Sequence, residues 1–264
     1  MNSIVSLTLK GIFRDRVFQG IMVLAVLFLF IPSVASLSMR EMTELTITLS
    51  LSLISFILLL LSVFLGATSI WKDIERRYTF SVVSLPISRT HYFIGKFLGV
   101  AIFLAMTAFV LGAAAMIAIK SATYGYPPSR PLLWSAILTA IMFDALKYII
   151  VAAVAMLLST VSTSFFLPVF GSISAYMAGT ITQQVYDYLQ TPSARASVSV
   201  VVRKAALYIY YLLPNLDSFN LNINATYAIP LNSDGIILTL AYFITYTLIL
   251  LCAAALLFNR REMK

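Results

Sequence analysis

The stretch Leu45–Trp71, LTITLSLSLISFILLLLSVFLGATSIW, runs for 27 residues without a charged side chain. A helix needs about 20 consecutive apolar residues to cross the hydrocarbon core of a bilayer, so this stretch predicts a transmembrane helix. The whole chain agrees, because 61% of its 264 residues are hydrophobic and only 11% are charged. Soluble domains are nearer half apolar and a quarter charged. The composition therefore excludes a cytosolic enzyme, a disordered regulator and a disulfide-stabilised secreted domain.

Five further apolar stretches have the length of a membrane span or nearly so. They are Val17–Leu37, Phe97–Ile119, Leu132–Leu158, Phe165–Thr182 and Ile236–Phe258. The stretch Val198–Leu213 is shorter, carries Arg203 and Lys204 at its centre, and is stopped by Pro214, which indicates an interfacial or re-entrant helix. The sequence therefore predicts an all-α polytopic membrane protein, a single domain over residues 1–264 with six transmembrane helices.

The distribution of basic residues predicts the orientation. If the N-terminus is inside, the inner segments hold eleven basic and four acidic residues, a net charge of +7, whereas the outer segments hold six basic and five acidic residues, a net charge of +1. Cytoplasmic segments carry the excess of Lys and Arg, so both termini are expected in the cytoplasm and the protein in the inner (plasma) membrane. The same rule accounts for the overall charge of +8 without nucleic acid as a partner.

The N-terminal residues 1–16 have polar and basic positions at helical spacing among apolar ones. This pattern predicts an amphipathic helix lying on the inner leaflet before the first span. The alternative is a signal peptide cut near Ser33-Val34-Ala35, which would leave five spans. The helical pattern and the charge balance favour the uncut chain.

Few residues are suited to metal or covalent chemistry. The chain has one cysteine, Cys252, and one histidine, His91, so neither a disulfide within the chain nor a His/Cys metal cluster is possible. The same count argues against nucleophilic catalysis by a Ser/His/Asp or Cys/His set. We therefore expect no cofactor, no metal and no catalytic residue on this chain.

The connection over residues 72–96 carries the most specific motifs. It contains Asp73-Ile-Glu75-Arg-Arg-Tyr-Thr79, then Val83-Ser-Leu-Pro86-Ile-Ser-Arg89, then Gly95-Lys96. This stretch resembles the ABC-2 type transporter permeases, in which a charged coupling helix is followed by a proline-bearing link into the third span. The N-terminal helix with Arg14-Asp15-Arg16 and the closing Phe258-Asn-Arg-Arg-Glu262 are similar to the same family. The stretch Leu213-Pro-Asn-Leu-Asp-Ser-Phe-Asn220 resembles the subgroup that includes the permease of nitrous oxide reductase maturation.

The resemblance implies a dimer, expected to be a homodimer, in which each permease docks a separate ATPase subunit. The chain lacks a Gly-x-x-x-x-Gly-Lys-[Ser/Thr] phosphate loop, so ATP hydrolysis is expected on the partner chain. The implied function is export of an unidentified, amphipathic or lipid-linked substrate. The alternative is mechanical transmission, in which the permease moves no substrate and drives a metallocofactor-assembly protein on the outer face through the extracytoplasmic segment 183–235.

Three groups of residues are candidates for a functional role. Asp73, Glu75, Arg76 and Arg77 are expected to contact the ATPase, although a solvated loop that sets topology would have the same charges. Asp144 and Lys147 lie three residues apart in the fourth predicted span and predict an intramembrane ion pair, either structural or functional. Gly171, Ala175 and Gly179 repeat at four-residue spacing, which allows close helix packing at a dimer seam along the substrate path or within one subunit.

Overall fold

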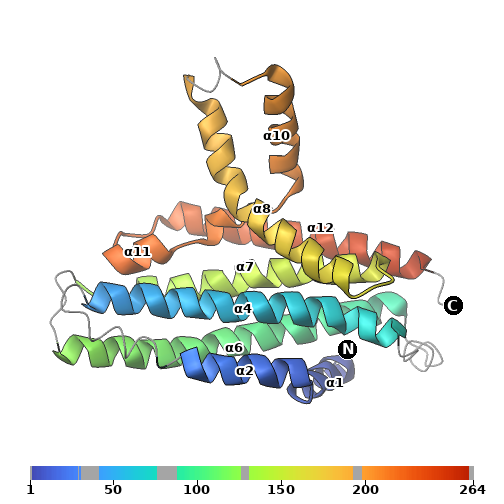
Figure 1. Ribbon diagram of the computed structural model, residues 1–264, viewed down its shortest axis with the longest axis horizontal. Coiled ribbons are helices and arrows are strands. Elements are labelled where there is room, and N and C mark those ends of the chain that lie inside the picture. The colour runs from blue at the N-terminus through green and yellow to red at the C-terminus, as the bar shows by residue number, and fades with distance from the viewer. Residues whose placement is uncertain are drawn as a thin grey trace.

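The computed structural model of the chain describes residues 2–28, 30, 42–75, 88–125, 131–192 and 198–261. Within these ranges the protein is all-helical and contains no strand. Figure 1 shows long helices lying side by side as a bundle, with a helical hairpin that projects from one side of it. The ends of the chain, marked N and C, lie toward the same end of the bundle, which we call the basal end (Figure 1).

Four helices form the bundle, and they confirm four of the predicted apolar segments. They are α4 (Met42–Glu75), α6 (Arg89–Gly125), α7 (Trp134–Val161) and α12 (Ser233–Arg260). Each is long and apolar enough to cross a membrane. Helix α7 packs against α4, α6 and α12, and 18 of its 28 residues are buried. It is therefore the central helix of the bundle.

At the other two predicted spans the helices have different bounds from those predicted. Helix α2 (Arg16–Phe28) covers the first half of Val17–Leu37, and the rest of that stretch lies outside the described residues apart from Phe30. Helix α8 (Phe166–Gln190) covers the fifth predicted span but continues into the polar sequence Gln183-Gln-Val-Tyr-Asp187. Among the described residues, four helices meet the length and hydropathy of a span, and α2 and α8 do not. Six spans with cytoplasmic termini stay a prediction.

Helix α8 changes direction about half-way along the bundle and leaves it (Figure 1). Helix α10 (Val200–Leu212) returns beside it, held by a stack of the Tyr186 and Tyr210 rings, whose centroids are 4.5 Å apart. We call residues 183–192 and 198–212 the arm. Helix α10 has no buried residue. Its range agrees with the short helix predicted at Val198–Leu213, which ends before Pro214.

The predicted amphipathic helix is present as α1 (Asn2–Phe13). Figure 1 shows it nearly end-on, so it runs across the bundle at the basal end, whereas the long helices run along it. Its contact with α6 is close because two glycines of α6 face it. A Cβ added at Gly95 would lie 2.9 Å from Ile4 Cγ2, and one added at Gly99 would lie 2.7 Å from Thr8 Cβ. Helix α1 is thus packed directly onto the start of α6.

Two arginines cap helix ends at the basal end. The Arg261 guanidinium donates to the carbonyl oxygens of Thr160 at 2.6 Å and Ser162 at 2.9 Å, where α7 ends. Arg89 donates to the carbonyls of Asn259 and Arg261, both at 3.3 Å, where α12 ends. The last carbonyls of a helix have no partner within it, so these side chains satisfy groups that otherwise need water. The end of the described chain is thereby fixed to α6 and α7.

Replacing Arg261 with methionine is expected to lower the free energy of unfolding by about 1–3 kcal/mol, because it removes charged hydrogen bonds to carbonyls at a helix end. The matched control is Arg260→Met, since Arg260 is the adjacent arginine and is exposed; its effect should stay within about 0.5 kcal/mol. Denaturant unfolding of both variants in one detergent measures the difference. Equal effects would show that the caps contribute nothing.

Candidate functional site

The segment 213–221 joins the arm to the short helix α11 (Asn222–Tyr227) and contains the 3-10 turn η1 (Asp217–Phe219). It packs against α7 and α12 at positions inside these helices, away from their ends. The Phe219 ring is buried, with its centroid 6.2 Å from that of Phe143, and the Asn215 backbone N–H donates to the Tyr242 hydroxyl at 2.8 Å. Phe143 and Tyr242 each stand nine residues after the start of their helix, which is about 14 Å along the axis.

Backbone without helical hydrogen bonds is costly inside a bilayer, where it occurs only if protein buries it or if it borders a polar cavity. Both conditions hold for the segment 213–221. The Leu216 N–H donates to the carbonyl of Gly179 in α8 at 3.1 Å, and the Asn215 side-chain amide donates to Gln183 Oε1 at 2.7 Å. On its other side the segment borders a cavity, which is the candidate functional site.

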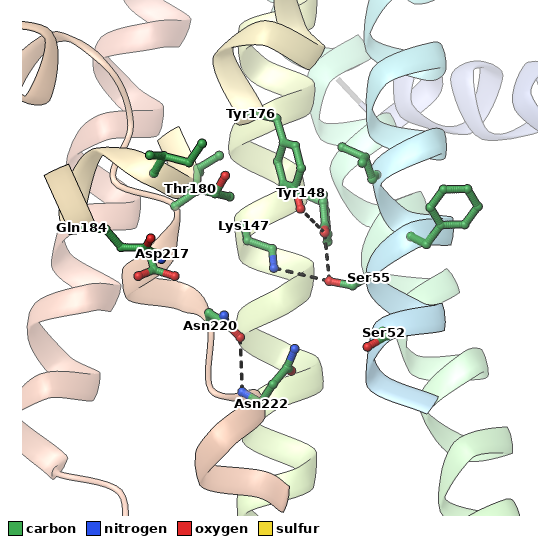
Figure 2. A pocket seen from close by; sticks show the side chains of 14 residues that line it. Ser52, Ser55, Lys147, Tyr148, Tyr176, Thr180, Gln184, Asp217, Asn220 and Asn222 are labelled. Atoms are coloured by element: carbon green, nitrogen blue, oxygen red, sulfur yellow. Dashed lines mark hydrogen bonds between the residues drawn. The ribbon is translucent and has the colours of Figure 1, made fainter. Parts of the chain in front are cut away.

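The cavity has a volume of about 470 Å³ and lies between α4, α7, α8 and the segment 213–221 with the start of α11. Its wall is mostly polar, as Figure 2 shows. The polar side chains that line it are Ser52 and Ser55 from α4, Lys147 and Tyr148 from α7, Tyr176, Thr180 and Gln184 from α8, and Asp217, Asn220 and Asn222 from the segment and α11. The volume is typical of a site for a small molecule.

The Asp144–Lys147 ion pair predicted from the sequence forms at this cavity. Lys147 Nζ lies 2.5 Å from Asp144 Oδ1 and 3.4 Å from Ser55 Oγ. Asp144 is 1% exposed and Lys147 is 5% exposed. Asp144 Oδ2 has no hydrogen-bond partner among the described residues. A charged side chain buried this fully would cost much more free energy without a partner than the pair does. Each of the two side chains therefore depends on the other.

A chain of hydroxyl groups leads from Lys147 toward α8 (Figure 2). Ser55 Oγ lies 2.9 Å from the Tyr148 hydroxyl, which lies 3.4 Å from the Tyr176 hydroxyl. Tyr148 is fully buried. These contacts join α4, α7 and α8 around the cavity, so a ligand that bound there would contact three helices of the bundle.

The predicted ATPase-contact residues are in different environments. The Asp73 carboxylate faces the start of α6, where it pairs with Lys96 and accepts a hydrogen bond from the Tyr92 hydroxyl. Glu75, the last residue of α4, is exposed. Arg76 and Arg77 lie outside the described residues. Two of the four residues predicted to contact the ATPase are described, and of these two Glu75 is the one that is exposed to solvent.

The three small residues of α8 do not share one contact. A Cβ added at Gly171 would lie 2.6 Å from Leu158 Cδ1 of α7, and one added at Gly179 would lie 2.5 Å from the carbonyl oxygen of Pro214. Ala175 is partly buried. Both glycines are therefore packed against their own chain, which agrees with the packing alternative. Whether this face also meets a second copy stays a prediction.

The sequence reasoning missed most of the cavity wall. The missed residues are Ser52, Ser55, Tyr148, Tyr176 and Thr180. Gln184, Asp217, Asn220 and Asn222 were included only as part of the extracytoplasmic segment 183–235. One signal in the sequence was available for part of the wall. Polar residues at Asn215, Asp217 and Asn220 alternate with apolar Leu216 and Phe219 directly after a helix-stopping proline, a pattern that suits a buried non-helical segment.

No three His, Cys, Asp or Glu side chains come together in the part of the chain that the structure describes. His91 Nδ1 lies 2.6 Å from Ser88 Oγ at the start of α6. Cys252 is exposed on α12. The arrangement at the cavity is suited to reversible binding of a polar group.

Comparison with known proteins gives no identification: no protein-family model matches the chain, and no curated protein matches it.

Proposed function

We propose that the chain is the membrane-spanning subunit of an ABC-2 type exporter, driven by ATP hydrolysis on a separate ATPase subunit. The observation that carries the proposal is the position of α1, which lies across the basal end of the bundle (Figure 1). A helix in this position is suited to receive a movement of a partner protein at the membrane surface. Its docking on α6 through Gly95 and Gly99 passes that movement to a long helix.

Ion pairs at the basal end support the same role. Lys72 near the end of α4 lies 2.5 Å from Asp15, which joins α1 to α2. Asp73 of α4 pairs with Lys96 of α6. The first pair joins α4 to the junction of α1 and α2, and the second joins α4 to α6. The predicted coupling connection, residues 72–96, runs from the end of α4 to the start of α6. A partner that pushed on the connection would therefore move α1, α4 and α6 together.

Charge supports an orientation with the basal end in the cytoplasm. The described residues there include eight basic and three acidic ones: Lys10, Arg14, Arg16, Lys72, Arg89, Lys96, Arg260 and Arg261 against Asp15, Asp73 and Glu75. Among the described residues, the opposite end has Lys120 against Glu44 and Asp234. An excess of Lys and Arg marks the cytoplasmic side, and the cytoplasm is where an ATPase finds ATP.

The test is purification of the tagged chain from its native membranes in a mild detergent, with each co-purifying subunit identified and counted. We expect an ATPase at one copy per permease. Glu75→Arg should abolish its recovery while the chain stays inserted in the membrane, because a reversed charge at an interface costs both attraction and desolvation. Asp234→Arg is the control, since Asp234 is exposed at the opposite end. An intact complex with Glu75→Arg would contradict the coupling role.

The same purification addresses the alternative function. A soluble outer-face protein recovered together with the ATPase would favour mechanical transmission over export. Recovery of the chain without an ATPase, under conditions that keep other transporter assemblies intact, would contradict both functions. Counting the permease copies in the complex tests the expected homodimer.

A further inference from the structure

We propose that the cavity between α4, α7 and α8 binds an amphiphilic amine, with its ammonium group at the Asp217 carboxylate and its apolar body toward Phe56 and Ile181. The inference rests on the proposed function for its biological role, since it names the chemical class of the exported substrate. Its physical basis is the charge, the shape and the rim of the cavity.

The charge of the cavity selects a cation. Two of the described residues that line it are charged, Lys147 and Asp217. The Lys147 ammonium is already neutralised by Asp144 at 2.5 Å. Asp217 has no such partner among the described residues, where only its backbone carbonyl is engaged, by the Asn220 N–H at 2.9 Å. The site therefore carries one uncompensated negative charge, and a bound group of charge +1 would neutralise it.

An anionic ligand is disfavoured by the same geometry. Lys147 is 5% exposed and already paired with Asp144, so an anion there would compete with a buried carboxylate and weaken the only ion pair that it forms among the described residues. An ammonium group meets no such competition. It would find hydroxyl and amide oxygens of Tyr176, Gln184 and Asn220 on the same wall, as well as the aromatic face of Tyr176.

The rim of the cavity favours an apolar body on the ligand. Phe56 of α4 and Ile181 of α8 line the cavity, yet they are 45% and 50% exposed. Because both side chains line the cavity and are also exposed, the cavity opens beside them to the surroundings of the bundle, where lipid is expected. A ligand with its charge at Asp217 and its hydrocarbon at this opening would match both environments.

The experiment measures binding of radiolabelled octylamine to the purified full-length chain in detergent, without any ATPase. Octanol and octanoate serve as competitors, because they have the same tail with a neutral or a negative head. We expect saturable binding that unlabelled octylamine displaces and that the other two do not. Asp217→Asn should weaken binding roughly tenfold or more, whereas Asp217→Glu should restore most of the affinity. Asp234→Asn, at an exposed site, is the control and should bind as the unmodified chain does.

Equal binding by Asp217→Asn and the unmodified chain would overturn the proposal, as would equal displacement by octanol. Size-exclusion profiles and helical circular dichroism establish that the variants are folded, and the Asp217→Glu variant guards against a general loss of structure. A lysolipid with an ethanolamine head is a further competitor: its displacement of octylamine assigns the site to a lipid headgroup, and its failure assigns it to a free amine. Because the assay needs no partner, its failure would leave the ATPase association test unaffected.

Discussion

Replacing Lys147 with methionine is expected to lower the free energy of unfolding by about 3–5 kcal/mol, because it leaves a charged Asp144 buried without its partner. Asp144 is 1% exposed, and its second oxygen has no hydrogen-bond partner in the described part of the chain. Methionine keeps the length of the side chain, so the loss reports the charge and not a cavity. Unfolding of the purified variant in detergent, followed by circular dichroism, measures the effect.

The double variant Asp144→Asn with Lys147→Met should recover most of that stability, since it removes both charges together. Lys204→Met is the control, because Lys204 lies exposed on α10, and it should shift stability by no more than about 0.5 kcal/mol. If the single and double variants were equally unstable, the pair would be important for its shape and not for its charges. A stable double variant that lost activity would instead assign the pair a functional role.

Replacing Gly179 with alanine is expected to lower the free energy of unfolding by about 1–3 kcal/mol, with a matching loss of ligand binding at the cavity. The added Cβ would lie 2.5 Å from the backbone oxygen of Pro214 and 3.1 Å from Leu216 Cδ1. A backbone carbonyl cannot rotate away as a side chain can. The segment 213–221 would have to move off α8, which breaks the hydrogen bond from the Leu216 N–H to the Gly179 carbonyl.

Gly20→Ala is the matched control, because Gly20 is also inside a helix and an added Cβ there meets nothing within 4 Å. It should be neutral or stabilising by about 0.5–1 kcal/mol, since alanine is the better helix former. Both variants are compared by thermal unfolding of the purified chain. A neutral effect at Gly179 would mean that the segment is not tightly held against α8.

The long helices were predictable from the sequence because the signal lies within each segment. The 27 uncharged residues of Leu45–Trp71 require burial or lipid whatever surrounds them, and Pro214 ends the helix before it because proline cannot continue one. The predicted pairing of Asp144 with Lys147 succeeded for the same reason, since residues three apart on a helix face each other.

The cavity was not predictable, because it depends on contacts between residues far apart in the chain. Ser55 meets Tyr148 across 93 positions, and no local pattern in the sequence places the segment 213–221 beside α7, where Phe219 packs on Phe143. Asp73 illustrates the same difficulty. Its sequence neighbours suggest an exposed charged surface, but its carboxylate faces Lys96, 23 residues later. A charged residue in a motif indicates that it has a partner, but the motif does not identify the residue or protein that is the partner.

The docking of α1 on α6 sets an order of events during synthesis of the chain. Ile4 packs against Gly95, which leaves the ribosome 91 residues later. At about 5–20 residues per second, this interval is roughly 5–20 s. During that time the side of α1 that carries Ile4 and Thr8 has no packing partner on α6. The docking of α1 on α6 therefore forms only after α4 has been synthesised.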